Sequence, residues 1–344
     1  MDQIHLILLS FQHNEQEAYP VIRKARSYGV AQSGIALLTI LVMVALATIL
    51  AATIAKRQTN TSENTGYLMR QNQSLLYAKS AEAFFSELLI QDSDNGGTID
   101  HLQENWAKPM PPFPVEDGLV SGRLIDESGK FNLNNLVKAD GNQVDDSARR
   151  WFEKLLQRVG LPAELSQAVI DWQDSNEEVT GAMGAESSYY QGLDPAYLVP
   201  NTKFHSVEEL KLVRGFEGKN YDLIKPYVTA LPEQTKVNIN TAPALLLASI
   251  DPKVDVKTVE QELKRKQTEL TYFNNAEDLW KLSVFSGIEQ QNKTDAAALL
   301  DSKSNYFTAQ IEVVLSERKR QFSSSLVRKD KQVSVYSRSL VPFE

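Results

Sequence analysis

One stretch of this sequence limits the possible folds more than any other. Residues 35–55, IALLTILVMVALATILAATIA, carry no charge and are almost entirely apolar. A helix of this length is about 31 Å long, close to the thickness of the hydrocarbon core of a bilayer. A secretory signal would have a shorter apolar region followed by small residues, whereas Lys56 and Arg57 follow here. The run therefore predicts one membrane-spanning helix, with most of the chain on one side of the membrane.

The composition excludes several classes of function. The 344-residue chain has a formal net charge of −8, which argues against a general nucleic-acid-binding protein. It has no cysteine, which excludes disulfides, thiolate metal sites and cysteine nucleophiles. Its four histidines lie too far apart in the sequence to form a local metal-binding pair. Residues 204–215 and 237–242 resemble helix-hairpin-helix pieces, but the acidic charge favours a packing role for them.

The helical pattern continues beyond the apolar run, because no proline occurs between this run and Pro109. Several apolar residues in this part fall roughly on one stripe of a helix: Leu68, Leu75, Leu76, Ala83 and Leu88. We expect this stripe to pack against a domain, so that one long helix lies in lipid at its start and against protein further on.

The patterns that follow predict an α+β fold. Two alternating runs in residues 118–136 indicate a β-hairpin with its turn at 127–129. Helical periods dominate the middle of the chain, and strand patterns return near the end, at 306–317, 321–329 and 332–340. We expect the hairpin and these last strands to form one small antiparallel sheet on the long helix, with a large all-α domain inserted between them.

The densest group of acidic residues lies between Val169 and Tyr190. It contains Asp171 and Asp174 at the end of a predicted helix, then Asn176, Glu177 and Glu178 in a glycine-containing loop, then Glu186. Carboxylate and amide oxygens on a bending loop are the ligands that Ca²⁺ prefers. Two alternatives remain open: a solvated acidic loop, and an acid–base pair of the glycosidase type formed by Asp171 with Asp174 or by Glu177 with Glu186.

The N-terminal part resembles the type IV pilin and type II secretion pseudopilin family. The resemblance rests on a leader with basic residues, then Ser33-Gly34, then an apolar helix that continues as an amphipathic one. It implies that a prepilin peptidase cuts after Gly34 and methylates Ile35. Family members usually carry glutamate five residues into the mature chain, where this chain has Thr39. The absence of this glutamate is typical of the K-subunit group of minor pseudopilins.

This resemblance covers almost the whole chain from Gly34 onward and implies its domain organisation. The expected parts are a cleaved leader (1–34), the transmembrane half of the pilin helix (35–55), its periplasmic half (56–95), the first part of the pseudopilin α/β domain (96–146), an inserted helical domain (147–303) and C-terminal strands (304–344).

The resemblance also bears on the acidic loop. The K-subunit group carries an Asp-Trp-x-Asp-x-Asp … Gly-x-Glu signature associated with calcium. The matching residues here are Asp171, Trp172, Asp174, Gly184 and Glu186, and Asn176 stands in place of the third aspartate. Asp174, Asn176 and Glu178 also have the alternate spacing of a calcium loop. Together, the spacing and the resemblance predict a structural Ca²⁺ held by Asp171, Asp174, Asn176, Glu178 and Glu186, and we expect Trp172 to anchor the loop in the core.

The function implied is that of a minor pseudopilin at the tip of the type II secretion pseudopilus, not that of an enzyme. The implied partners are the I, J and H minor pseudopilins, the major pseudopilin and the prepilin peptidase, with no nucleic acid. The implied location is the inner membrane, with the large domain in the periplasm. A single-pass tethered protein that binds a periplasmic ligand is the main alternative, and a tethered carboxylate hydrolase is the third.

Overall fold

The structure is a computed structural model that describes residues 33–94 and 97–343. The described part of the chain divides into two compact units, with the boundary between Gly66 and Tyr67. The first helix, α1 (Ser33–Asp94), contributes to both units. Residues 1–32 of the predicted leader lie outside the described residues.

In the first unit, α1 contains the predicted membrane span. Among the described residues, α1 is the one helix long and apolar enough to cross a membrane, and none of its most apolar window is buried. The threonine hydroxyls donate hydrogen bonds to carbonyls of the preceding turn: Thr39 to Ala36 at 2.9 Å, Thr48 to Val44 at 2.8 Å and Thr53 to Ile49 at 2.7 Å. The polar groups of this segment are therefore satisfied within the helix, as a hydrocarbon environment requires.

The second unit contains a five-stranded antiparallel sheet in the order β1-β2-β7-β8-β9. Its strands are β1 (Met110–Val115), β2 (Gly118–Asp126), β7 (Tyr306–Leu315), β8 (Arg318–Lys329) and β9 (Gln332–Ser339). The central pair β2–β7 runs without a break from Gly118 opposite Leu315 to Asp126 opposite Phe307. The predicted sheet and its three C-terminal strands are thus confirmed.

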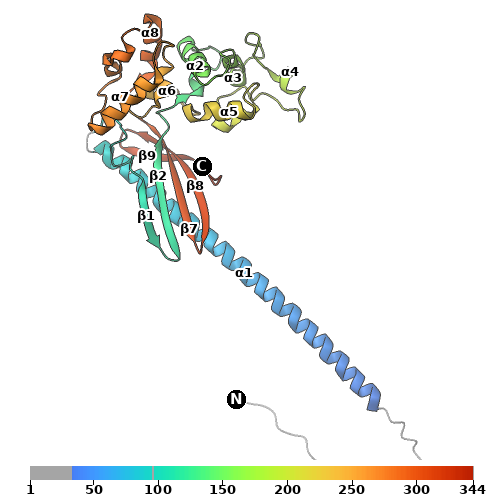
Figure 1. Ribbon diagram of the computed structural model, residues 1–344. Coiled ribbons are helices and arrows are strands. Elements are labelled where there is room, and N and C mark those ends of the chain that lie inside the picture. The colour runs from blue at the N-terminus through green and yellow to red at the C-terminus, as the bar shows by residue number, and fades with distance from the viewer. Residues whose placement is uncertain (1–32, 95–96, 344) are drawn as a thin grey trace, which may run out of the picture. The chain divides into compact units, whose positions relative to one another are not determined.

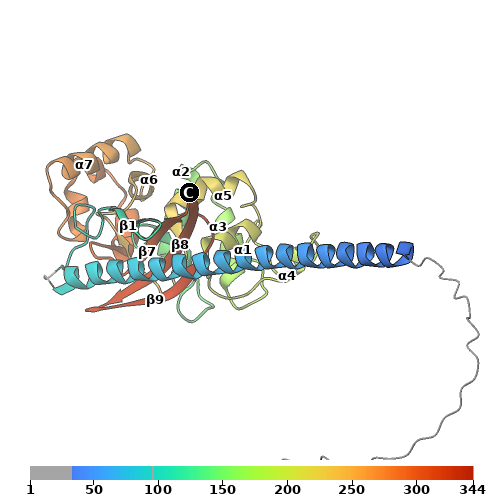
Figure 2. The same ribbon diagram turned by 90° about the horizontal axis from the view of Figure 1, so that it is seen from below.

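The C-terminal part of α1 packs against this sheet, as Figure 2 shows from below. Phe85 and Leu89 of the helix are completely buried among sheet residues such as Ile311 and Val313. Apolar burial of this kind contributes about 1.5–3 kcal/mol for each large side chain. The prediction that the long helix packs on the sheet is therefore confirmed.

The face of α1 that packs is not the predicted stripe. Leu68 and Leu76 remain 58% and 64% exposed, while the small residues Ala78 and Ala81 face the sheet. Small side chains let the helix approach the sheet closely, so Phe85 can fill the remaining space. Of the predicted stripe, Leu68, Leu75 and Leu76 are exposed, while Leu88 is half-buried and packs against the core.

The predicted hairpin is displaced along the chain. Its turn lies at Glu116-Asp117 between β1 and β2, where Asp117 adopts a φ of 62°, and not at residues 127–129. The partner strand β1 contains Pro111, Pro112 and Pro114 and therefore reads as a loop in the sequence. Prolines are compatible with an edge strand, because its outer N–H groups need no partner.

A mainly helical insert separates β2 from β7. Figure 1 shows it at the end of the sheet where β2 ends and β7 begins. Its helices are α2 (Asp146–Arg158), α3 (Leu165–Gln173), α4 (Ser187–Tyr190), α5 (Lys219–Ile224), α6 (Ala244–Ala248), α7 (Val256–Thr268) and α8 (Gln290–Leu299), with 3-10 turns η1 (Leu133–Asn135), η2 (Val207–Leu212), η3 (Lys225–Tyr227), η4 (Ala276–Lys281) and η5 (Ser283–Phe285). The insert also contains two short pairs of parallel strands: β3 (Phe131–Asn132) with β4 (Val228–Thr229), and β5 (Val237–Asn238) with β6 (Leu300–Asp301).

The insert has its own apolar core, separate from that between α1 and the sheet. Trp151 and Phe152 of α2 are buried in it, and Phe131 packs on both rings. Ser206 and Glu209 form a capping box at the start of the 3-10 turn η2. The α+β fold with a large helical insert is therefore confirmed, while the exact domain boundaries stay predictions.

Candidate metal centre

The acidic loop begins where α3 ends. Asp171 lies in the last turn of α3, and Asp174 caps this helix, with its N–H bonded to the carbonyl of Ile170 at 2.9 Å. Trp172 between them is 3% exposed and packs against Tyr190, so it anchors the loop in the core as predicted. The indole therefore fixes the point at which the chain leaves the helix.

Three carboxylates converge in this loop. Asp171, Asp174 and Glu186 are at most 3% exposed, and one oxygen of each lies within 4.8 Å of the others. Both oxygens of Asp171 accept a hydrogen bond from the N–H of Thr180 at 3.1 Å. Neither oxygen of Glu186 has a hydrogen-bond partner among the described residues. A buried carboxyl group without a partner is costly, which points to a ligand that the protein atoms do not supply.

The electrostatics of the site agree with its geometry. Burial, followed by the charges of Asp171, Asp174 and Glu177, raises the pKa of Glu186 to about 8. Burial also raises the pKa of Asp174 to about 6, and raises the pKa of Asp171. Within the described ranges, no lysine or arginine forms an ion pair with Asp171, Asp174 or Glu186. The site therefore holds excess negative charge that a cation would neutralise.

Two predicted ligands lie differently from the other three. Asn176 donates its side-chain amide to Asp174 at 2.9 Å, and its side-chain oxygen accepts from the N–H of Glu178 at 2.7 Å. The side chain of Glu178 is exposed and does not belong to the converging group. The structure thus brings together three of the five predicted ligands, places Asn176 beside them and leaves Glu178 outside.

Two residues near the site were not among the predicted ligands. Glu177 accepts hydrogen bonds from Ser187 at 2.9 Å and from Asn201 at 3.0 Å, and its charge acts on Glu186. The side-chain oxygen of Asn201 is buried and has no hydrogen-bond partner in the part of the chain that the structure describes. Glu177 was visible as part of the acidic run, but no spacing in the sequence pointed to Asn201, which only the tertiary fold brings to the loop.

Gly184 lets the loop close around these carboxylates. A Cβ at this position would lie 2.4 Å from Oδ2 of Asp171 and 2.5 Å from the carbonyl oxygen of Thr180. The carbonyl of Gly184 accepts a hydrogen bond from Arg214 at 2.9 Å, which fixes its peptide. A side chain at this position would displace the neighbouring carboxylate. The glycine of the sequence signature is therefore required by contact with the site itself.

The arrangement suits a hard cation better than acid–base catalysis. Ca²⁺ binds carboxylate and amide oxygens in flexible geometry, and the converging groups here are of those two types. Two cavities of about 250 Å³ are lined by other residues. Asp171, Asp174 and Glu186 therefore fit a structural metal site.

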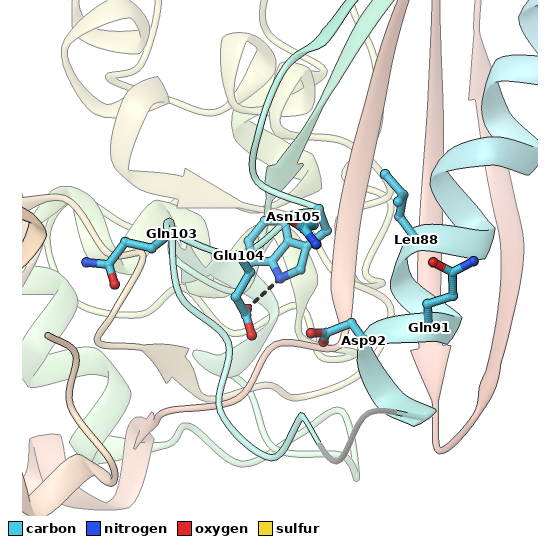
Figure 3. A pocket seen from close by; sticks show the side chains of 7 residues that line it. Leu88, Gln91, Asp92, Gln103, Glu104 and Asn105 are labelled. Carbon is cyan, nitrogen blue, oxygen red and sulfur yellow. Dashed lines mark hydrogen bonds between the residues drawn. The ribbon is translucent and has the colours of Figure 1, made fainter. Parts of the chain in front are cut away.

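A second group of carboxylates provides a contrast. Asp92, Asp100 and Glu104 also have oxygens within 4.8 Å of one another, and two of them border a cavity of about 250 Å³ beside the last turns of α1 (Figure 3). Here Arg328 donates to Asp92 at 2.8 Å and to Asp100 at 2.5 Å. This group contains its own cation, whereas the group around Glu186 does not.

Comparison with known proteins gives consistent matches along the chain. Residues 129–233 and 237–300 match family models described as Type II secretion system (T2SS), protein K. A type II secretion system protein K from Aeromonas hydrophila is 33% identical over 316 residues, which cover 86% of this chain and 93% of that protein. The protein of the same name from Pseudomonas aeruginosa is 32% identical over 320 residues, covering 90% and 93%.

A solved structure matches the fold. It is a chain in the crystal structure of the GspK-GspI-GspJ complex from the type 2 secretion system of enterotoxigenic Escherichia coli. The match has a TM-score of 0.73 at 22% identity and covers 81% of this chain and 100% of that chain. At this identity the likeness concerns the fold.

Proposed function

The chain belongs to the type II secretion system protein K family, and from this premise we propose that it is a minor pseudopilin at the tip of a type II secretion pseudopilus. Its apolar segment Ile35–Ala55 anchors it in the inner membrane, and the second unit lies in the periplasm. A prepilin peptidase cuts between Gly34 and Ile35 before assembly. The family is a component of a secretion apparatus, so an enzymatic role for the carboxylates has no support from it.

The uncovered face of α1 carries this proposal. In the second unit, one face of the helix is buried on the sheet, while Leu68, Met69 and Leu76 on the outer face are 58%, 68% and 64% exposed. A row of exposed large apolar side chains on a soluble surface is typical of an interaction site. The helices of other pseudopilins, the I, J and H subunits and the major subunit, are the partners that would cover it. Their contact with α1 would continue the packing of apolar helices that begins in the membrane.

The residue at position five supports placement at the tip. The hydroxyl of Thr39 donates a hydrogen bond to the carbonyl of Ala36 at 2.9 Å and carries no charge. It therefore cannot neutralise the N-terminal amine of a neighbouring subunit, as a glutamate would. A subunit at the tip has no neighbour above it that requires this neutralisation, and the bulky insert would obstruct further stacking.

The acidic loop completes the proposal as a structural calcium site. Asp171, Asp174 and Glu186 would hold the ion, with Asn176, Glu177 and Asn201 beside them. Ca²⁺ at this position would neutralise the buried carboxylates and tie the loop to α3. The buried, unpartnered carboxyl group of Glu186 is the observation that supports this part.

Intact mass and N-terminal sequencing of the full chain from membranes test the maturation step. With an active prepilin peptidase, we expect a chain that begins at Ile35 and carries one added methyl group. Gly34→Val should abolish cleavage, whereas Gly29→Ala in the same leader should not. A chain that keeps its leader beside an active peptidase would contradict the proposal and favour a tethered ligand-binding protein.

Co-isolation with other pseudopilins tests assembly through α1. Leu76→Glu should reduce recovery of I- and J-type subunits without changing the thermal stability of the chain, because this side chain is 64% exposed. Lys257→Glu, on the exposed surface of α7, is the matched control and should leave recovery unchanged. Equal recovery with both variants would exclude the outer face of α1 as the interface. Cross-linking that finds the chain along the whole filament would exclude the tip position.

A further inference from the structure

A buried polar network lies where α1, the sheet and the helical insert meet. We define this junction network by its seven residues: Asp92, Asp100, Asp126, Asn238, Thr241, Ser304 and Arg328. They come from the end of α1, the segment after it, the end of β2, the insert, the segment before β7, and β8. Four of them, Asp100, Asn238, Ser304 and Arg328, are at most 1% exposed. Polar burial at this depth requires closely matched partners.

Arg328 forms the part of the network on the side of α1 and the sheet. Its guanidinium donates one hydrogen bond to Asp92 at 2.8 Å and another to Asp100 at 2.5 Å. The same group donates to the carbonyl of Ser304 at 2.7 Å. One side chain thereby joins the end of α1, the segment that follows it and the chain returning from the insert. A planar guanidinium can make these bonds together, whereas a single ammonium cannot reproduce their geometry.

Asn238 and Thr241 extend the network into the insert. The side-chain amide of Asn238 donates to the carbonyl of Asp100 at 3.0 Å and to the hydroxyl of Ser304 at 2.7 Å. Thr241 and Ser304 each donate a hydroxyl to the same oxygen of Asp126, both at 2.5 Å. Each of these bonds has a fixed direction, so it tolerates little rotation of the insert.

The two apolar cores do not fix the insert to the sheet. Among residues 33–94 and 97–343, the core of the insert and the core between α1 and the sheet are two separate clusters and do not merge into one continuous apolar core. Across the same boundary, Lys329 and Glu233 form an ion pair at 2.6 Å, but both side chains are about 60% exposed and such pairs add little. The junction network is thus a buried polar connection between the two parts, beside the stacking of His101 on Tyr272.

We propose that the junction network fixes the orientation of the helical insert relative to the sheet and the C-terminal part of α1, and that Arg328 is the residue on which this depends. Turning the insert would separate Asn238 and Thr241 from their acceptors and leave buried carboxylates without donors. Buried charges that lose their partners are strongly disfavoured, so one orientation is selected. The inference concerns the second unit alone and holds whether or not the chain acts at a tip.

Distance distributions between two labels measure this directly. Because the chain has no cysteine, Ser80→Cys in α1 and Lys257→Cys in α7 give two unique spin-label positions, both exposed. Pulsed dipolar spectroscopy on the full chain in detergent should show one narrow distribution. Arg328→Met should widen it by about twofold or more, since two buried carboxylates then lose their shared donor. Arg328→Lys, which keeps the charge, should give an intermediate width.

A matched control separates loss of orientation from loss of stability. Arg150 pairs with the buried Asp295 inside the insert at 2.7 Å, so Arg150→Met removes a comparable ion pair away from the junction. It should lower the melting temperature and leave the width unchanged. If Arg328→Met does not fold, Ser304→Ala, which removes a central hydroxyl without changing charge, provides the deciding measurement. A parent-like width in every folded junction variant would overturn the proposal.

Discussion

The pKa of Glu186 leads to a quantitative prediction for the metal-free chain. Burial raises this pKa from 4.5 to about 8. Near neutral pH, the folded state therefore holds a proton that the unfolded state has lost, and the difference destabilises the fold by about 3 kcal/mol. Because the folded pKa lies above the unfolded one, the free energy of unfolding without metal should fall as the pH rises from about 4.5 to about 8.

Glu186→Gln removes this ionisation. Without metal near neutral pH, the variant should be more stable than the parent by up to about 3 kcal/mol, which raises the melting temperature of a domain of this size by about 6–12 °C. Added calcium should reverse the order. At a concentration one thousand times its dissociation constant, calcium would stabilise the parent by about 4.1 kcal/mol, which exceeds the advantage of the variant, while a variant without the third carboxylate gains much less.

Thermal unfolding of the full chain in detergent, with EGTA and with millimolar calcium, measures both effects. The melts are repeated near pH 5, where the parent and the variant should differ least in EGTA. Glu164→Gln makes the same change at an exposed position and should match the parent throughout. The reasoning is refuted if parent and variant melt together in EGTA near neutral pH and calcium shifts neither of them.

Three further substitutions probe the site and the core. Gly184→Ala should weaken calcium binding by about tenfold or more, because its Cβ would lie 2.4 Å from a carboxylate oxygen. Gly192→Ala is the control and should leave the affinity unchanged, and equal affinities of the two variants by calorimetry would contradict this prediction. Glu177→Gln should reduce calcium-induced stabilisation in thermal melts more than Glu178→Gln does, because of these two residues Glu177 acts electrostatically on Glu186. A larger effect of Glu178→Gln would show that Glu178 is the ligand. Phe85→Ala should lower the free energy of unfolding of the sheet unit by about 3–5 kcal/mol in urea titrations, and a loss below about 1 kcal/mol would contradict its burial.

Local patterning made much of the fold predictable. The uncharged run Ile35–Ala55 and the alternation in the last three strands depend on neighbouring residues alone, and both predictions hold. Strand β1 could not be predicted in this way, because Pro111 and Pro112 suit a loop equally well until an adjacent strand is known. The leucines of α1 predicted the wrong packing face for a related reason. Periodicity identifies an apolar face of a helix but not the surface that covers it.

The same distinction between local and tertiary contacts applies to the candidate metal site. Asp171, Asp174 and Glu186 lie close enough in the sequence for their spacing to predict convergence, and the structure brings them together. Asn201 reaches the loop only through the path of the intervening chain, so local spacing carries no signal for it. The same holds for Arg328, which contacts Asp92 across 236 positions of sequence.

The place of the insert in the sheet also determines the order of folding. Neighbouring strands β2 and β7 are separated by residues 127–305, so pairing them in an unfolded chain would close a very long loop. The contacts within the insert are more local and form faster. Once folded, the insert holds its two ends together and shortens the search for the pairing. We therefore expect the sheet to be completed last, when β7 to β9 arrive, so that a chain halted before Tyr306 would leave Phe85 and Leu89 without their cover.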